Sequence, residues 1–249
     1  MIDLTRRGAV SVLQMTHGKA NALDVELCDA LTARFVEFAQ SDAGALVITG
    51  QGRIFSAGVD LLRVVNGGAD YVRAFLPALN RMCGTLFDME KPVVAAVNGH
   101  AIAGGCIIAC AADYRLMARD SGRIGVPELL VGVPFPVVPL EIMRFSTPPQ
   151  HLQSLAYSGT TFTADEALER GIVDVVANPD RLLDEAIEMA ASLAAIPTPA
   201  FALTKRLMRE PTMRRIRAGA AFYADVVEAW ASDEILGAIR AYVGKTLKR

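Results

Sequence analysis

Short apolar runs alternate with segments of helical periodicity between residues 10 and 177. Such runs are typical of parallel strands whose two faces are both covered by helices. Asp24–Gln40 has apolar residues close to helical spacing, and Thr163–Arg170 begins with the pattern of a capping box, so both are predicted helices. The predicted strands are Val10–Met15, Ala45–Thr49, Pro92–Val97, Tyr114–Ala118 and Ile172–Ala177.

The last part of the chain is richer in helix-favouring and charged residues. Pro179–Ala195 is predicted to be helical, and Pro197 and Pro199 separate it from a further helical stretch. We therefore predict an α/β core at residues 1–195 and a helical region at residues 196–249. The apolar stripes of that region are typical of a core or of a subunit interface.

Residues 93–112 carry no formal charge, and this run is long enough to cross a bilayer. It is interrupted by Asn98-Gly99, which is a turn signal, and by Gly104-Gly105. The run therefore predicts a buried strand followed by the start of a buried helix, and no membrane association.

The composition excludes several classes of protein. The chain has 249 residues, of which 52% are hydrophobic, so it is not disordered. Its net charge of −2 argues against a nucleic-acid binder, which needs a basic surface. Its first residues lack the apolar segment of a signal peptide, and its four cysteines lack disulfide-scaffold or metal-ligand spacing. We expect a cytoplasmic protein with reduced thiols and no bound metal.

Two segments of small residues follow predicted strands and indicate a ligand site. They are residues 52–61 and residues 97–110, and in the second Gly104-Gly105 opens a helix. Glycine and alanine let a ligand approach the main chain, and the first N–H groups of a helix have no partner inside it. Two such loops could together offer backbone N–H groups to a developing oxyanion.

These segments also carry a resemblance to a known family. The chain resembles the crotonase (enoyl-CoA hydratase/isomerase) superfamily, and the matching pieces run in family order through most of the sequence. They are residues 19–24 (KANALD), 55–61 (FSAGVDL), 92–99 (PVVAAVNG), 103–106 (AGGC), 112–115 (ADYR), 124–128 (IGVPE), 163–167 (TADEA) and 171–174 (GIVD).

The resemblance implies an α/β fold, a crotonase-like spiral of ββα units followed by a C-terminal helical trimerisation region. It implies an acyl-CoA thioester substrate, with CoA as part of the substrate and no separate cofactor. It also implies self-association as a homotrimer or a dimer of trimers. The backbone N–H groups of Val59 and Gly104 take the positions of the family's oxyanion hole. The positions implied for substrate binding are Ala20, Ala57, Gly58, Asp60, Leu61 and Ile107.

The acid–base residues bear on the choice of reaction. Hydratases of the family use two glutamates, and this chain has Ile107 at the first position and Glu128 at the second. Hydration needs two such groups around one water, whereas one carboxylate can shift a double bond by moving a proton from C2 to C4. The pattern therefore favours a Δ3,Δ2-enoyl-CoA isomerase with Glu128 as its base. It resembles the single-glutamate mitochondrial-type branch.

Two alternatives stay open at this point. One is an enoyl-CoA hydratase or another crotonase-type lyase, for which Glu141 could supply a second acid from an unusual position. The other is a catalytically weak protein that binds acyl-CoA.

Other charged residues have simpler interpretations. His17 and His100 have no carboxylate at a spacing that predicts an orienting hydrogen bond, so we expect structural or ligand-contacting roles. A group of cations in one helical stretch is expected to form a solvated face, with a ligand phosphate as the alternative partner. The group comprises Lys205, Arg206, Arg209, Arg214, Arg215 and Arg217.

Overall fold

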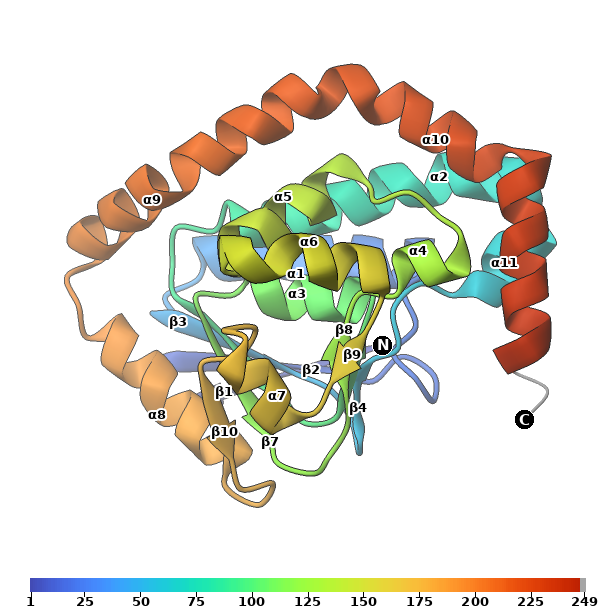
Figure 1. The fold of residues 1–249 in the computed structure, drawn as a ribbon. Coiled ribbons are helices and arrows are strands. Elements are labelled where there is room, and N and C mark those ends of the chain that lie inside the picture. The colour runs from blue at the N-terminus through green and yellow to red at the C-terminus, as the bar shows by residue number, and fades with distance from the viewer. Residues whose placement is uncertain (247–249) are drawn as a thin grey trace.

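The computed structural model describes residues 1–246 and shows two sheets surrounded by helices (Figure 1). The strands are β1 Ile2–Arg7, β2 Val10–Met15, β3 Ala45–Thr49, β4 Ile54–Ser56, β5 Val93–Val97, β6 His100–Ile102, β7 Tyr114–Ala118, β8 Ile124–Gly125, β9 Thr161–Phe162 and β10 Val175–Ala177. The helices are α1 Val25–Gln40, α2 Leu61–Phe87, α3 Gly104–Ala111, α4 Glu128–Val131, α5 Val137–Ser146, α6 Pro149–Ser158, α7 Ala164–Glu169, α8 Leu182–Ala194, α9 Thr198–Ala218, the 3-10 turn Gly219–Phe222, α10 Tyr223–Ala231 and α11 Asp233–Thr246.

The chain repeats a strand–strand–helix unit three times. The first strand of each unit (β3, β5, β7) joins a six-stranded sheet of order β1-β2-β3-β5-β7-β10, and the second (β4, β6, β8) joins a four-stranded sheet of order β4-β6-β8-β9. Helices α2, α3 and α4 complete the three units. This arrangement confirms the predicted α/β spiral of ββα units.

The strands of the large sheet are buried on both faces, as their continuous apolar runs predict. Leu46 and Ile48 of β3 face the core beneath α1, α2 and α3, whereas Ala45 and Val47 face α8. Figure 1 shows α8 on the side of the sheet away from α1. The uncharged run at 93–112 forms β5, β6 and α3, which confirms that it is several buried elements.

The predicted boundaries are close to those observed. The capping box at Thr163 and Glu166 is present at the start of α7. The last predicted strand is shorter than expected, because only Val175–Ala177 pairs with β7.

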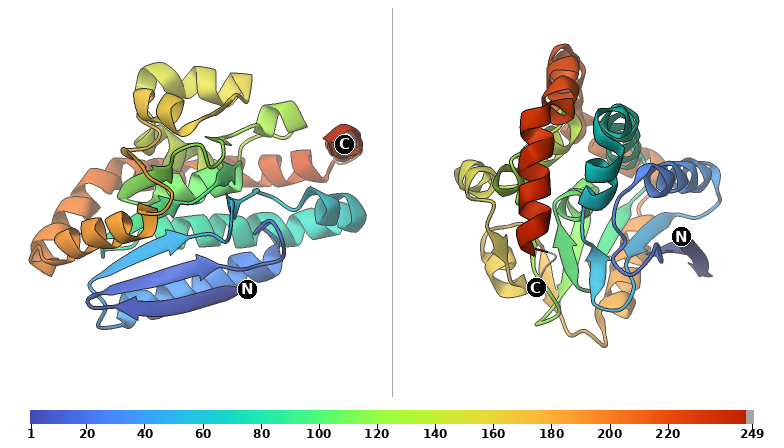
Figure 2. Two further views of the ribbon diagram at one scale, coloured as in Figure 1. Left: turned by 90° about the horizontal axis from the view of Figure 1, so that it is seen from below. Right: turned by 90° about the vertical axis from the view of Figure 1, so that its right-hand side faces the viewer.

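The helical region after residue 195 wraps around the core. Helix α9 packs along α5, while α10 and α11 pack on α2 and α11 also reaches α4. Figures 1 and 2 show α9 and α10 running over the outside of the molecule and α11 turning down beside α2. No single described helix is both long and apolar enough to cross a membrane; one bent pair, Leu182–Ala194 with Thr198–Ala231 at 102°, meets the length and composition criteria together. The division at residue 195 and self-association stay predictions.

A buried ion cluster fastens α9 to the core. Lys205 Nζ lies 2.6 Å from one carboxylate oxygen of Asp113, and Arg209 Nη2 lies 2.8 Å from the other. Both cationic side chains are buried, so the expectation of a solvated face is wrong for these two. Arg206, Arg214 and Arg217 do lie at the surface.

Candidate active site

Three parallel strands of the small sheet end at the same edge. Ser56 of β4 pairs with Ala101 of β6, and Ile102 pairs with Gly125 of β8. Because parallel strands run in the same direction, the segments that follow them emerge side by side. These segments are Ala57–Val59, Ala103–Gly104 and Val126–Glu128, so the fold brings together the loops that the sequence singles out.

The first two loops touch at Gly58. Its φ of +82° is a conformation that L side chains rarely adopt, and a Cβ there would lie 2.6 Å from Ile102 O and 3.3 Å from Gly104 N. Ala103, which precedes Gly104, has φ +51°, which costs of order 1–3 kcal/mol in a non-glycine residue. Its N–H donates to Gly125 O at 2.8 Å, so the neighbouring strand holds this strained turn in place.

Two backbone N–H groups at this junction are free to bind a ligand. Leu23 N–H donates to Gly58 O at 2.7 Å, and Asp60 N–H donates to Leu23 O at 2.9 Å. These two hydrogen bonds flank Val59, so the Val59 N–H itself points away from Leu23. Gly104 is the first residue of α3, so its N–H has no acceptor within the helix. Within residues 1–246 neither N–H makes a hydrogen bond.

Glu128 shares a cavity with Val59 and Ala103 of these two loops. It is the first residue of α4 and is only 8% exposed, and its Oε2 has no hydrogen-bond partner among the described residues. Burial disfavours the charged carboxylate and raises the pKa of Glu128 to about 8. A buried carboxyl with a raised pKa and an unpaired oxygen has the properties of a general base.

Glu128 opens into a small, mainly apolar cavity of about 90 Å³. The cavity reaches from the two loops to the C-terminal helices. Its lining consists of Ala57, Val59, Leu61, Ile102, Ala103, Pro127, Glu128, Val131, Val133, Trp230 and Tyr242. The structure thus brings Val59, Ala57 and Leu61 to one cavity with Glu128.

The remaining predicted site residues have other positions. Ala20 O accepts a hydrogen bond from Ala57 N–H at 3.0 Å, which places it beside the first loop. The Asp60 carboxylate caps α2 by accepting from Arg63 N–H at 3.0 Å. Ile107 is 1% exposed in the core and does not line the cavity. Position 107 therefore supplies neither a titratable group nor a cavity wall.

Glu141 is held in ion pairs away from the cavity. Its carboxylate lies 3.1 Å from Arg144 Nε and 2.6 Å from Arg215 Nε. It borders a separate hollow between α5 and the start of α10. Because these ion pairs hold the carboxylate outside the Glu128 cavity, the structure does not support a second acid at this position.

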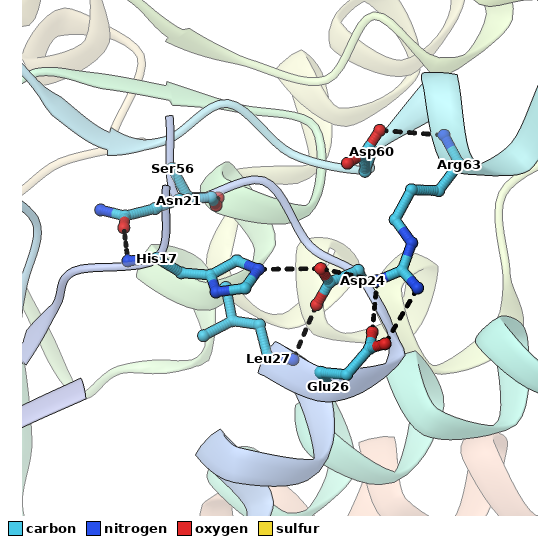
Figure 3. Close-up of polar contacts among 8 residues, drawn as sticks. All are labelled: His17, Asn21, Asp24, Glu26, Leu27, Ser56, Asp60 and Arg63. Atoms are coloured by element: carbon cyan, nitrogen blue, oxygen red, sulfur yellow. Dashed lines mark hydrogen bonds and ion pairs between the residues drawn. The ribbon is translucent and has the colours of Figure 1, made fainter. Parts of the chain in front are cut away.

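A polar network that residue spacing alone does not predict supports the first loop (Figure 3). His17 Nε2 lies 2.8 Å from Asp24 Oδ2, and Arg63 Nη1 lies 3.0 Å from the same oxygen. Burial raises the pKa of Asp24, but hydrogen bonds from Leu27 N–H and His17 outweigh it and bring that pKa below its usual value. The expectation that no carboxylate orients His17 is wrong, because the turn at residues 17–24 brings Asp24 back to the ring.

Asn21 and Ser56 continue this support to Gly58. Ser56 Oγ donates to Asn21 O at 2.7 Å and accepts from Gly58 N–H at 3.2 Å. The Asn21 amide donates to Met15 O and to Phe55 O, and its Oδ1 accepts from His17 N–H. A fully paired buried network fixes the geometry of the backbone that it holds. Here it fixes the loop that presents the Val59 N–H.

Comparison with known proteins agrees with this geometry. The family model for enoyl-CoA hydratase/isomerase matches residues 5–247. The chain belongs to the enoyl-CoA hydratase/isomerase family. Members of this family that resemble it include carnitinyl-CoA dehydratase from Salmonella arizonae, which is 35% identical over 88% of this chain and 86% of the relative.

Solved structures of the family have the same fold. Human mitochondrial delta3-delta2-enoyl-CoA isomerase superposes with a TM-score of 0.94 at 25% identity, covering 99% of this chain and 98% of that one. The enoyl-CoA hydratase EchA3 from Mycobacterium ulcerans superposes with a TM-score of 0.84 at 31% identity, covering 93% and 99%. An acyl-CoA thioester substrate is consistent with this family. The names of these relatives span dehydratase, hydratase and isomerase, so membership leaves the choice of reaction to the residues of the site.

Proposed function

We propose that this family member is a Δ3,Δ2-enoyl-CoA isomerase. The observation that carries the proposal is the cavity lining, in which Glu128 is the only carboxyl group among the described residues and lies among apolar side chains. In this reaction Glu128 removes a proton from C2 of a 3-enoyl thioester, and the electron pair spreads into a dienolate. Protonated Glu128 then returns the proton at C4, and the double bond moves from C3–C4 to C2–C3 without gain or loss of atoms.

The two free N–H groups supply the second requirement. Negative charge builds on the thioester oxygen when the C2 proton leaves, and donors from Val59 and Gly104 stabilise it. Each such donor is worth about 10²–10³-fold in rate. The support from Ser56 and Asn21 keeps the Val59 donor in place before the substrate binds.

Hydration is the second candidate, since relatives of this chain are named dehydratase and hydratase. It requires a water and a second proton-transfer group beside the first carboxylate. Ile107 cannot transfer a proton, and Glu141 is bound to arginines elsewhere. Lack of one acid–base partner lowers the rate by about 10²–10⁴-fold, so the residues favour isomerisation.

The decisive assay offers the purified protein a 3-enoyl-CoA and, separately, a 2-enoyl-CoA. We expect the 3-enoyl-CoA to gain the absorbance of a conjugated thioester at constant mass. The 2-enoyl-CoA should take up little or no water, as judged by mass spectrometry. Rapid addition of water to the 2-enoyl-CoA, without isomerisation of the 3-enoyl-CoA, would overturn the proposal in favour of a hydratase. Tight binding of both without turnover would identify an acyl-CoA-binding protein.

The pH dependence of the isomerisation should follow Glu128. As a base it acts in the deprotonated form, and burial raises its pKa to about 8. We therefore expect kcat/KM to rise with pH and to level off above about pH 8, since this parameter reports ionisation of the free enzyme. Initial rates in buffers of constant ionic strength from pH 5 to 9 test this. A profile that is already level from pH 5 upward would place the midpoint near the ordinary glutamate value of about 4.3, and would mean that another group, or an exposed carboxylate, is the base.

A further inference from the structure

The roof of the Glu128 cavity comes from the C-terminal helices of the same chain. Trp230 of α10 and Tyr242 of α11 line the cavity opposite the two loops. Helix α11 packs so tightly here that a Cβ at Gly132, just after α4, would lie 2.9 Å from Ala238 Cβ. Helices α10 and α11 thus form one wall of the cavity, and α11 packs closely on the residue that ends α4.

Trp230 is a fixed part of this roof. It is 2% exposed, and its Nε1–H donates to Pro134 O at 2.8 Å. Pro134 belongs to the proline-rich segment between α4 and α5, so one hydrogen bond ties that segment to α10. Displacement of the indole would leave the Pro134 carbonyl without its hydrogen-bond donor. This cost disfavours movement of Trp230 away from the cavity.

The size and polarity of the cavity define what fits beneath the roof. An apolar protein cavity of about 150 Å³ holds benzene, so one of this size holds a group of roughly four carbon atoms. Its volume of about 90 Å³ is small for a ligand site, and apart from Glu128 and the Tyr242 hydroxyl the side chains that line it are hydrocarbon or aromatic. A long acyl chain does not fit within this volume.

We propose that Trp230 and Tyr242 limit the acyl group of the substrate to a short, uncharged chain of about four to six carbons. This inference rests on the proposed function, because it assumes that the thioester lies at the Val59 and Gly104 N–H groups. The thioester end lies at those donors, the carbons that exchange protons lie beside Glu128, and the end of the chain meets the two aromatic rings.

Binding of unreactive saturated acyl-CoAs tests the limit without any reaction. Trp230 is the only Trp of the chain, so its fluorescence reports directly on the roof. We expect butyryl- and hexanoyl-CoA to bind with a fluorescence change, and decanoyl-CoA to bind about 10-fold more weakly or worse, the size of effect that misfit methylenes have in a pocket. Affinity that rises steadily from butyryl- to decanoyl-CoA would overturn the proposal.

A variant of the roof tests the residue assignment. Tyr242→Ala should improve the affinity for decanoyl-CoA relative to butyryl-CoA by about 10-fold, and should shift the kcat/KM profile of a 3-enoyl-CoA series toward longer chains. Tyr157→Ala is the matched control, because Tyr157 is 67% exposed on α6 and does not line the cavity. An unchanged length profile in folded Tyr242→Ala would contradict the assignment. If that variant does not fold, the wild-type binding series still decides the length limit.

The outcomes separate this inference from the proposed function. If the proposed reaction is wrong, the wild-type protein forms a different product, but the order of its affinities for saturated acyl-CoAs is unaffected. If the proposed length limit is wrong, the order of these affinities differs from the expected one, whichever product is formed. Tighter binding of a C4 acyl-CoA with a terminal trimethylammonium group than of hexanoyl-CoA would also overturn the proposal, and would identify the two rings as a cation-binding pair.

Discussion

Glu128→Gln is expected to lower kcat for a 3-enoyl-CoA by about 10³-fold or more, while KM changes little. Glutamine keeps the shape of the side chain in the cavity but cannot take the C2 proton, and general base catalysis contributes about 10²–10⁴-fold. Measurement of kcat and KM by the absorbance of the conjugated product tests this. The matched control is Glu141→Gln, which removes a carboxylate of the same 8% exposure outside the cavity. It should keep kcat within a few-fold, although it loses two ion pairs.

The stability of Glu128→Gln provides an independent check. The folded state raises the pKa of Glu128 to about 8, so it binds this proton more tightly than the unfolded chain does. The stability linked to this proton is present in full below the unfolded pKa and is lost as the pH rises to about 8. The variant should therefore melt at a higher temperature than the wild type at pH 9, and the gap should close toward pH 5. Equal melting temperatures at both pH values, with kcat unchanged, would show that this carboxyl is not the buried base.

Gly58→Ala should lower kcat/KM by about 10²–10³-fold, since each donor to the thioester oxygen is worth that much. The added Cβ would meet Ile102 O at 2.6 Å and the Ala103 Cβ at 2.8 Å, and would force apart the loops that carry the two free N–H groups. The loss should appear in kcat, with only a minor change in the affinity for butyryl-CoA, because charge on the oxygen develops only during reaction.

Gly8→Ala is the control for Gly58→Ala. Gly8 has φ +60°, also in the left-handed region, yet nothing lies within 4 Å of a Cβ placed there. Gly8→Ala therefore introduces backbone strain comparable to that of Gly58→Ala, about 1–2 kcal/mol, without the clash between loops. We expect lower stability and unchanged kcat/KM. If folded Gly58→Ala is as active as Gly8→Ala, the free N–H groups of these loops do not stabilise the transition state.

Local patterns were sufficient to predict most of the framework. The buried runs that form β3 and β5 are recognisable because both faces of these strands are covered, and the capping box of α7 lies within four residues. The loops after β4 and β6 are marked by glycines that a close approach requires, such as Gly58. These features depend on neighbours in sequence or on the regular geometry of parallel strands, so they can be recognised from the sequence alone.

Features that depend on segments distant in sequence cannot be predicted from local patterns. The Lys205 and Arg209 side chains find Asp113 about ninety residues away in sequence, so helical spacing alone could not show that they are buried. The apolar stripes after residue 195 predict only a core or an interface, because nothing local indicates that α10 brings Trp230 to the Glu128 cavity. Ile107 shows the opposite case, in which a family position predicts a role at the cavity and the side chain points into the core instead.

The position of the roof in the chain bears on when the protein becomes active during synthesis. Glu128 leaves the ribosome before α10 and α11, and domains generally begin to fold from the N-terminal side. Until those helices dock, water reaches the carboxyl, which then ionises near the value of about 4.3 for a free glutamate. Docking of Trp230 and Tyr242 confines the space around the carboxyl to a cavity of about 90 Å³. The late folding step that buries this carboxyl is thus also the step that raises its pKa and makes it a stronger base.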